Sequence, residues 1–152
     1  MLYDVIIIGG GPAGAAAAIY SARKKLKTLL ITDSFGGQSV VSADIQNWIG
    51  EPHISGFDLA QKLECHVRSF GGAVEIKMPE KAIEIKSVRC STSDRICDFE
   101  VKTDQGNVYE GKALILAVGA RRKKLSVSGE EKFNGKGVAY CSTCDAPLFS
   151  EK

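Results

Sequence analysis

The chain has 152 residues, the length of one ordinary domain, with hydrophobic residues at 44% and charged residues at 25%. Its formal net charge of +2 singles out no nucleic-acid or membrane partner. No basic leader precedes the first apolar stretch and no apolar run is long enough to span a bilayer, so we expect a cytoplasmic protein.

The first predicted elements are a strand, a glycine-rich turn and a helix. Tyr3–Ile8 is an unbroken apolar run, typical of a parallel strand buried on both faces, and Pro12–Lys25 reads as a helix. The motif G-x-G-x-x-G, with its glycines at Gly9, Gly11 and Gly14, connects this strand to the helix and extends into the first turn of the helix. These glycines allow a tight turn, close approach of a pyrophosphate and close packing of helix on strand, and the helix N-terminus attracts phosphate. The alternative is an ordinary glycine-rich turn that binds nothing.

The second predicted strand, Lys27–Thr32, is parallel to the first by the right-handed crossover rule. Asp33 follows it directly, where an acid in such units accepts the adenosine ribose hydroxyls. A simple turn or helix cap at Asp33 is the competing interpretation.

A polar, glycine-punctuated stretch then runs from Ser34 to Gly50, and long loops in compact domains tend to be functional. Gly36 and Gly37 allow close backbone approach to a flat ligand, and Gln38 and Asn47 offer hydrogen-bond donors and acceptors. Turn chemistry alone is the alternative for each.

The middle of the chain predicts a helix followed by strands. Ser55–Phe70 carries an amphipathic stripe, Gly71 and Gly72 are expected to stop it, and its Cys65 is expected to be a small buried hydrophobe. A strand at Ala73–Lys77 follows. Period-two alternation then predicts a small antiparallel meander beside the parallel sheet, with strands at Ala82–Arg89, Asp98–Thr103 and Asn107–Glu110. Lys112–Val118 reads as another buried parallel strand that ends at Gly119.

The cysteines direct attention to the end of the chain. Their odd number, five, argues against a disulfide scaffold. Cys141 and Cys144 form a C-x-x-C pair followed by Asp145, and such a pair exchanges electrons with a partner disulfide through a mixed disulfide. A zinc knuckle is the alternative, but it needs about four ligands and no second C-x-x-C or C-x-x-H is present, so we expect no metal.

Taken together, Gly9–Gly14, the Phe35–Gln38 loop, Gln46–Trp48 and the C-x-x-C-D motif resemble the low-molecular-weight thioredoxin reductase family over essentially the whole chain. The resemblance implies an α/β, Rossmann-like FAD-binding three-layer fold with a parallel sheet and an antiparallel meander. Residues 1–119 would be the first part of the FAD-binding domain. Residues 120–152 would be the linker and the start of the NADPH-type domain that carries the cysteine pair.

The resemblance also implies a mechanism. Electrons would pass from NADPH through FAD to Cys144, which lies against the flavin in that family, while Cys141 attacks the disulfide of thioredoxin or a similar protein. Asp145 would be the acid/base. The implied assembly is a homodimer. Cofactor contacts are expected at Gly9, Gly11, Pro12, Ala13, Gly14, Thr32, Asp33, Gly37, Gln38, Asn47, Ala117 and Gly119.

Two departures from the family pattern concern Val118 and Ala146, where a threonine and a glycine are usual. The second glycine fingerprint that binds NADPH in the family does not occur in this sequence, so we expect an N-terminal fragment that does not turn over alone. Two alternatives stay open. One is a peroxiredoxin-reducing flavoprotein, since the chain also resembles the flavoprotein component of alkyl hydroperoxide reductase. The other is a non-catalytic FAD- or ADP-binding module.

Overall fold

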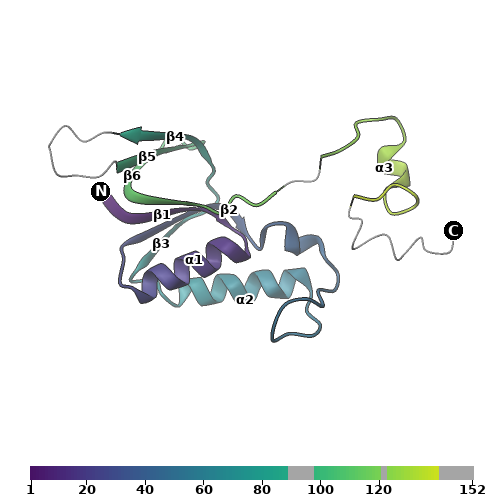
Figure 1. Ribbon diagram of the computed structural model, residues 1–152, viewed down its shortest axis with the longest axis horizontal. Coiled ribbons are helices and arrows are strands. Elements are labelled where there is room, and N and C mark those ends of the chain that lie inside the picture. The colour runs from purple at the N-terminus through teal and green to yellow at the C-terminus, as the bar shows by residue number, and fades with distance from the viewer. Residues whose placement is uncertain (89–97, 121–122, 141–152) are drawn as a thin grey trace. The chain divides into compact units, whose positions relative to one another are not determined.

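The computed structural model describes residues 1–88, 98–120 and 123–140, and its described residues include one mixed six-stranded sheet (Figure 1). The strand order is β3-β2-β1-β6-β5-β4. Neighbours from β3 to β6 are parallel, whereas β5 is antiparallel to both β6 and β4. The strands are β1 (Leu2–Gly10), β2 (Thr28–Phe35), β3 (Val74–Lys77), β4 (Ala82–Val88), β5 (Asp98–Thr103) and β6 (Val108–Leu116).

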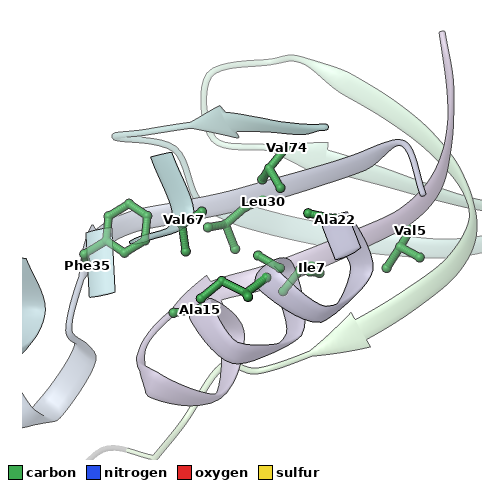
Figure 2. Close-up of a cluster of buried hydrophobic side chains, with 10 residues drawn as sticks. Val5, Ile7, Ala15, Ala22, Leu30, Phe35, Val67 and Val74 are labelled. Carbon is green, nitrogen blue, oxygen red and sulfur yellow. The ribbon is translucent and has the colours of Figure 1, made fainter. Parts of the chain in front are cut away.

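The first core lies between the parallel strands and two helices, α1 (Pro12–Arg23) and α2 (Gly56–Arg68). Figure 2 shows how Val5 and Ile7 of β1 meet the alanines of α1 on this face. Small residues on α1 let the helix approach the sheet closely, so the apolar β-branched strand is covered without a gap. The helix ends at Arg23, slightly before the predicted end at Lys25.

The second core lies on the opposite face of the same strands. Alternate residues of β1, such as Ile6 and Ile8, point here and pack with Val101 of β5 and with Tyr109 and Leu114 of β6. The meander thus covers the face that the helices leave open, giving helices, parallel strands and meander as three layers (Figure 1). The prediction of an α/β three-layer arrangement is confirmed. The meander is continuous with the parallel sheet through β6, rather than a separate sheet beside it.

The predicted parallel strand after Gly111 is confirmed by the parallel pairing of β6 with β1, but two other predictions about this region are wrong. Asn107–Glu110 and Lys112–Val118 are not separate strands, because β6 runs through both: its first half pairs with β5, and from Glu110 to Leu116 it pairs with β1. The second stretch is also not buried, with Leu116 60% and Val118 68% exposed. Beyond Gly111, β6 pairs with β1 alone among the described strands, so one edge of it is unpaired there, and the side chains near its end are exposed.

Two further differences concern α2 and β2. The Ser55 side chain caps α2 by accepting from the Asp58 backbone N–H at 3.0 Å, but the helix ends at Arg68, before the glycines expected to stop it. Cys65 is exposed on this helix, not buried as predicted. Strand β2 continues beyond Thr32 to Phe35, so Asp33 lies within a strand.

By its internal contacts the chain divides into two units, Met1–Gly119 and Ala120–Lys152. In the described part of the second unit, a short helix α3 (Glu130–Phe133) begins with a buried glutamate. The Glu130 carboxylate accepts backbone N–H groups from Leu125 at 2.9 Å and Ser126 at 2.6 Å. No helix in the described ranges combines the length and apolarity needed to cross a bilayer.

Candidate dinucleotide-binding site

The glycine loop joins the carboxyl end of β1 to the start of α1. Gly9 has a φ of +111°, and a Cβ at this position would strike the backbone of Ala117. A Cβ on Gly14 would collide with the carbonyl oxygen of Gly9. Two of the three motif glycines are therefore required by packing alone. Gly11 is different, because its added Cβ would meet only the Cα of Gly37, at 4.0 Å.

The start of α1 is open to an anion. Gly11 is the N-cap and has no side chain to satisfy the first N–H groups, and Pro12 occupies the first turn. No acidic residue lies in that turn, so nothing there offsets the positive end of the helix dipole. Ala13, also in that turn, is exposed. These features suit a phosphate group.

The loop after β2 lies directly against the glycine loop. Gly36 has a φ of +90°, and its N–H donates to the Gly10 carbonyl at 2.9 Å. A Cβ built on Gly37 would lie 3.4 Å from the Cα of Gly11, so two bare backbones face each other here. Gln38 is exposed near the start of the 3-10 helix η1 (Gly37–Val41) that follows. The contact between these two loops is therefore made by backbone rather than by side chains.

The end of β6 completes the same edge of the sheet. The Ala117 N–H donates to the Ile8 carbonyl at 2.8 Å, which continues the pairing of β6 with β1 past Leu116. Gly119 follows with a φ of +66° and is exposed. Carboxyl ends of parallel strands meet at one edge, so Gly9, Gly37 and Ala117 are brought together although they are far apart in sequence.

The end of β2 holds the two polar residues singled out there. Thr32 is buried, and its hydroxyl donates to the Ser34 carbonyl at 2.8 Å, beside Gly10. Asp33 is exposed and pairs with Lys81, with 3.2 Å between Oδ2 and Nζ. Sequence reasoning missed Lys81. The available signal is that Lys81 follows the end of β3, a parallel neighbour of β2.

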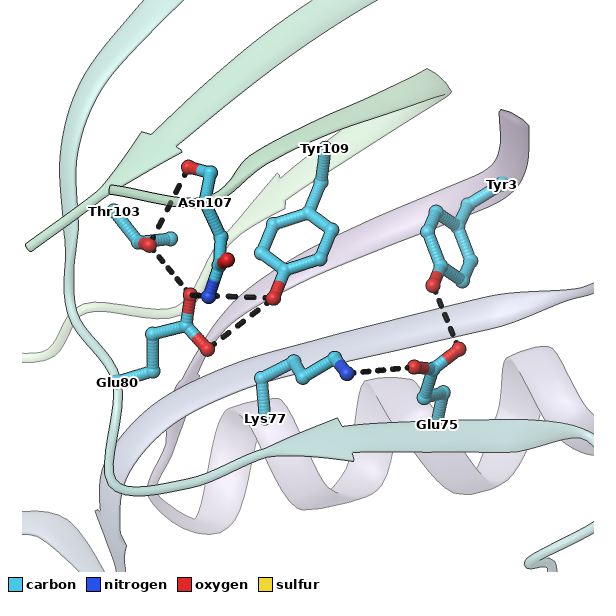
Figure 3. Close-up of polar contacts among 7 residues, drawn as sticks. All are labelled: Tyr3, Glu75, Lys77, Glu80, Thr103, Asn107 and Tyr109. Carbon is cyan, nitrogen blue, oxygen red and sulfur yellow. Dashed lines mark hydrogen bonds and ion pairs between the residues drawn. The ribbon is translucent and has the colours of Figure 1, made fainter. Parts of the chain in front are cut away.

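A polar network fixes this end of the sheet (Figure 3). The buried Glu80 carboxylate accepts hydrogen bonds from Thr103 at 2.5 Å, Asn107 at 2.9 Å and Tyr109 at 3.2 Å. Burial, and then the negative charge of Glu80, raises the pKa of Tyr109. These contacts tie the segment after β3 to the turn between β5 and β6.

A second polar group lies along the same strands (Figure 3). Tyr3 donates to the Glu75 carboxylate at 2.6 Å, and Lys77 pairs with Glu75 at 2.9 Å. Burial, and then the hydrogen bond to Glu75, raises the pKa of Tyr3 above its ordinary value, whereas bonds from Tyr3 and Lys77 lower the pKa of Glu75. This group joins β1 to β3 and is not part of the edge of the sheet where Gly9, Gly37 and Ala117 lie.

Asn47 belongs to a different feature. The loop around it is closed by a bridge between Ile45 and Ile54, and His53 lies 3.0 Å from the Asp44 carboxylate. Hydrogen bonds from Gln46 and His53 lower the pKa of Asp44. Asn47 itself is exposed. A cleft of about 500 Å³ opens between this loop and α2, lined by Asp44, Glu51, His53, Ile54, Ser55, Asp58, Gln61 and Lys62. The lining contains none of the predicted cofactor residues.

Three predicted catalytic residues, Cys141, Cys144 and Asp145, lie outside the described residues. Within the described part of the chain, no group of three or more His, Cys, Asp or Glu side chains is arranged to hold a metal ion.

Several known proteins are similar to this chain. Residues 3–152 match the family model described as pyridine nucleotide-disulphide oxidoreductase. The NADH dehydrogenase of Bacillus subtilis (strain 168) is 41% identical over 150 residues, which is 99% of this chain and 28% of that protein. A component of the alkyl hydroperoxide reductase of Escherichia coli (strain K12) is 39% identical over 150 residues, again 99% of this chain and 28% of that protein.

Solved thioredoxin reductases share the fold. The enzyme from Streptococcus pyogenes MGAS5005 aligns with a TM-score of 0.74 and 37% identity, over 97% of this chain and 45% of that one. The Lactococcus lactis enzyme aligns with a TM-score of 0.72 and 35% identity, over 96% and 45%. The chain therefore spans about a quarter of the curated relatives cited and just under half of these solved structures. The predicted Rossmann-like, FAD-binding type of fold is confirmed, and the chain belongs to the pyridine nucleotide-disulphide oxidoreductase family.

Proposed function

We propose that this chain contributes the FAD-holding part and the redox-active cysteine pair of a disulfide reductase of the thioredoxin reductase type. The observation that carries the proposal is the edge of the sheet where an uncapped helix N-terminus and two facing glycine backbones lie together. A dinucleotide with a doubly charged pyrophosphate needs close approach to bare backbone and free N–H donors. Family membership supports the same conclusion.

Each part of FAD has residues suited to it. Gly9, Gly11, Pro12, Ala13 and Gly14 would hold the pyrophosphate, and Asp33, next to Thr32, would accept the adenosine ribose hydroxyls. The remaining predicted residues, by the resemblance, would lie along the flavin and its ribityl chain: Gly37, Gln38, Asn47, Ala117 and Gly119. A valine at Val118 has no hydroxyl to donate, so contacts there would come from the backbone. When bound, FAD supplies a carrier that takes two electrons from a nicotinamide and passes them on.

The dithiol performs the exchange with the protein substrate. The Cys141 thiolate attacks one sulfur of the partner disulfide, which forms a mixed disulfide and releases the first partner thiolate. The Cys144 thiolate then attacks the Cys141 sulfur, which closes the pair and releases the second partner thiolate. The partner gains two electrons and the pair loses two. Asp145 is proposed to move the protons as the sulfurs change charge.

The proposed electron donor is NADPH, and the proposed partner is thioredoxin or a thioredoxin-like protein, with the complete protein a cytoplasmic homodimer. We propose that residues 1–119 are the first part of the FAD-binding domain, and that residues 120–152 are the linker and the start of the NADPH-type domain that carries the cysteine pair. Relatives named as a component of alkyl hydroperoxide reductase favour a second candidate, a flavoprotein that reduces a peroxiredoxin.

The cofactor assignment is tested with the chain itself. Purified protein is titrated with FAD while flavin fluorescence and absorbance are followed, and ADP is added as a competitor for the adenosine half. Saturable binding that ADP reverses is expected. Failure of FAD and ADP to bind would overturn the assignment of a dinucleotide site to the edge of the sheet where Gly9, Gly37 and Ala117 lie.

The redox assignment is tested in the complete protein from the same source. The Cys141→Ser and Cys144→Ser variants are each expected to abolish reduction of a thioredoxin disulfide while FAD remains bound. Cys65→Ser is the matched control, because this exposed cysteine lies on α2. Comparing thioredoxin with a peroxiredoxin-system disulfide as substrate separates the two candidate functions.

A further inference from the structure

Lys81 is held at both its backbone and its side chain. Its N–H donates to the Asp104 carboxylate at 2.9 Å, and its carbonyl accepts the Asp104 N–H at 2.9 Å. Its ammonium lies 3.2 Å from the Oδ2 atom of Asp33. A lysine on a free loop would lose considerable conformational entropy on forming such a pair, but here the backbone is already fixed.

The preceding residue accounts for that fixed position. Glu80 is 3% exposed, and a carboxylate is costly to bury unless donors surround it. Its side-chain partners described above come from the turn between β5 and β6 and the strands beside it, while its backbone N–H donates to the Thr32 carbonyl at 3.0 Å. Glu80 therefore locks the segment after β3 between the meander and the end of β2 (Figure 3).

Glu80 and Lys81 lie at the edge of the sheet that carries the candidate dinucleotide site. The parallel strands β2 and β3 end there, beside the glycine loop, and open α/β sheets bind ligands at the carboxyl ends of their strands. Lys81 pairs with Asp33 at this edge. The contact uses the Oδ2 atom of Asp33, and a carboxylate has a second oxygen that can also accept hydrogen bonds.

We propose that Lys81 is a positioning residue of the dinucleotide site, holding the Asp33 carboxylate so that its second oxygen accepts the ribose hydroxyls of an adenine nucleotide. The inference rests on the proposed nucleotide site. Both side chains are about half exposed, so water screens the pair, and the expected effect on affinity is about two- to five-fold.

The test is a calorimetric titration of the full chain with two probes, ADP and 2′,3′-dideoxy-ADP, which lacks the ribose hydroxyls. The variants are Lys81→Gln, Asp33→Asn and the double variant. Lys86→Gln is the matched control, because it removes an equally exposed lysine that pairs with Glu84 on the meander. Thermal unfolding of each variant checks that the fold is unchanged.

The proposal expects Lys81→Gln to weaken ADP about two- to five-fold, to leave dideoxy-ADP unchanged, and to have no further effect in the Asp33→Asn background. An equal loss for both probes would mean that Lys81 acts on the phosphates directly, and would overturn the proposal, as would an unchanged ADP affinity. If wild-type protein binds ADP and only the variant result fails, the dinucleotide site stands and the positioning role falls. If wild-type protein does not bind ADP, both fall.

Discussion

Alanine at Gly14 is expected to lower the stability of the fold, whereas alanine at Gly11 is expected to weaken FAD binding, although both glycines belong to one motif. At Gly14 the new methyl group would enter the space of the Gly9 carbonyl, and neither backbone can rotate away. Overpacking of this kind costs up to about 3 kcal/mol. Alanine has a better helix propensity by about 1 kcal/mol. The Gly14→Ala variant is therefore expected to lose about 2 kcal/mol of unfolding free energy.

At Gly11 the same methyl group has room in the protein, because the nearest heavy atom beyond the neighbouring residues is 4.0 Å away and the backbone φ is −72°. Unfolding free energy is expected to change by less than about 0.5 kcal/mol, since the loss of a glycine N-cap is offset by a less flexible unfolded chain. The methyl group would instead cover backbone that the pyrophosphate is proposed to contact. FAD affinity should fall about ten-fold, equal to about 1.4 kcal/mol.

The assay pairs urea unfolding of cofactor-free protein, followed by circular dichroism, with FAD titration of the same samples. Urea dependence should keep its slope in both variants, so that midpoints compare directly. The reasoning is refuted if Gly11→Ala is the less stable variant, or if it binds FAD as tightly as wild type.

Three further expectations concern the polar groups of the sheet. Replacing Glu80 by Gln should lower the unfolding free energy by about 1–3 kcal/mol, because buried donors lose a charged acceptor. The control variant Glu84→Gln, on the exposed strand β4, should change the unfolding free energy by less than about 0.5 kcal/mol. Equal urea midpoints for the two variants would contradict this expectation. The folded-state pKa of Tyr3 is raised, so its stabilising contribution is complete below the unfolded pKa of about 10 and is lost as pH rises further. Tyr3→Phe should therefore lose less stability than wild type between about pH 9 and pH 11, and parallel curves would argue against it. The folded-state pKa of Glu75 is lowered, so its contribution is present above the unfolded value of about 4 and disappears as pH falls through the folded value. Acid unfolding of Glu75→Gln should show a shallower loss below about pH 4 than wild type, and an identical acid limb would exclude this role.

Much of the fold could be read from local pattern. The apolar run before Gly9 predicts a doubly buried strand, and β1 has Ile6 and Ile7 fully buried on opposite faces. The motif spacing predicts the turn, and Gly14 meets the Gly9 carbonyl as the close helix–strand packing requires. The cysteine motif carries a chemical hypothesis that stays a prediction, because Cys141 and Cys144 lie outside the described residues.

Other features depend on contacts between segments that are distant in the chain. Nothing in the local sequence shows that Lys81 differs from other exposed lysines. Its place beside Asp33 follows from the pairing of β2 with β3 and from the burial of Glu80. Leu116 lies in an apolar stretch of sequence and is nevertheless exposed. The side chains of a strand are buried by elements that pack on its faces, and the strand's own sequence does not show whether such elements are present. Periodicity and glycine spacing report the local backbone, so the strand–turn–helix could be read from the amino-acid pattern alone, whereas phosphate binding by its loop stays a prediction. The backbone that faces Gly11 and the cation that pairs with Asp33 come from distant parts of the chain, because both depend on the order in which the strands pair.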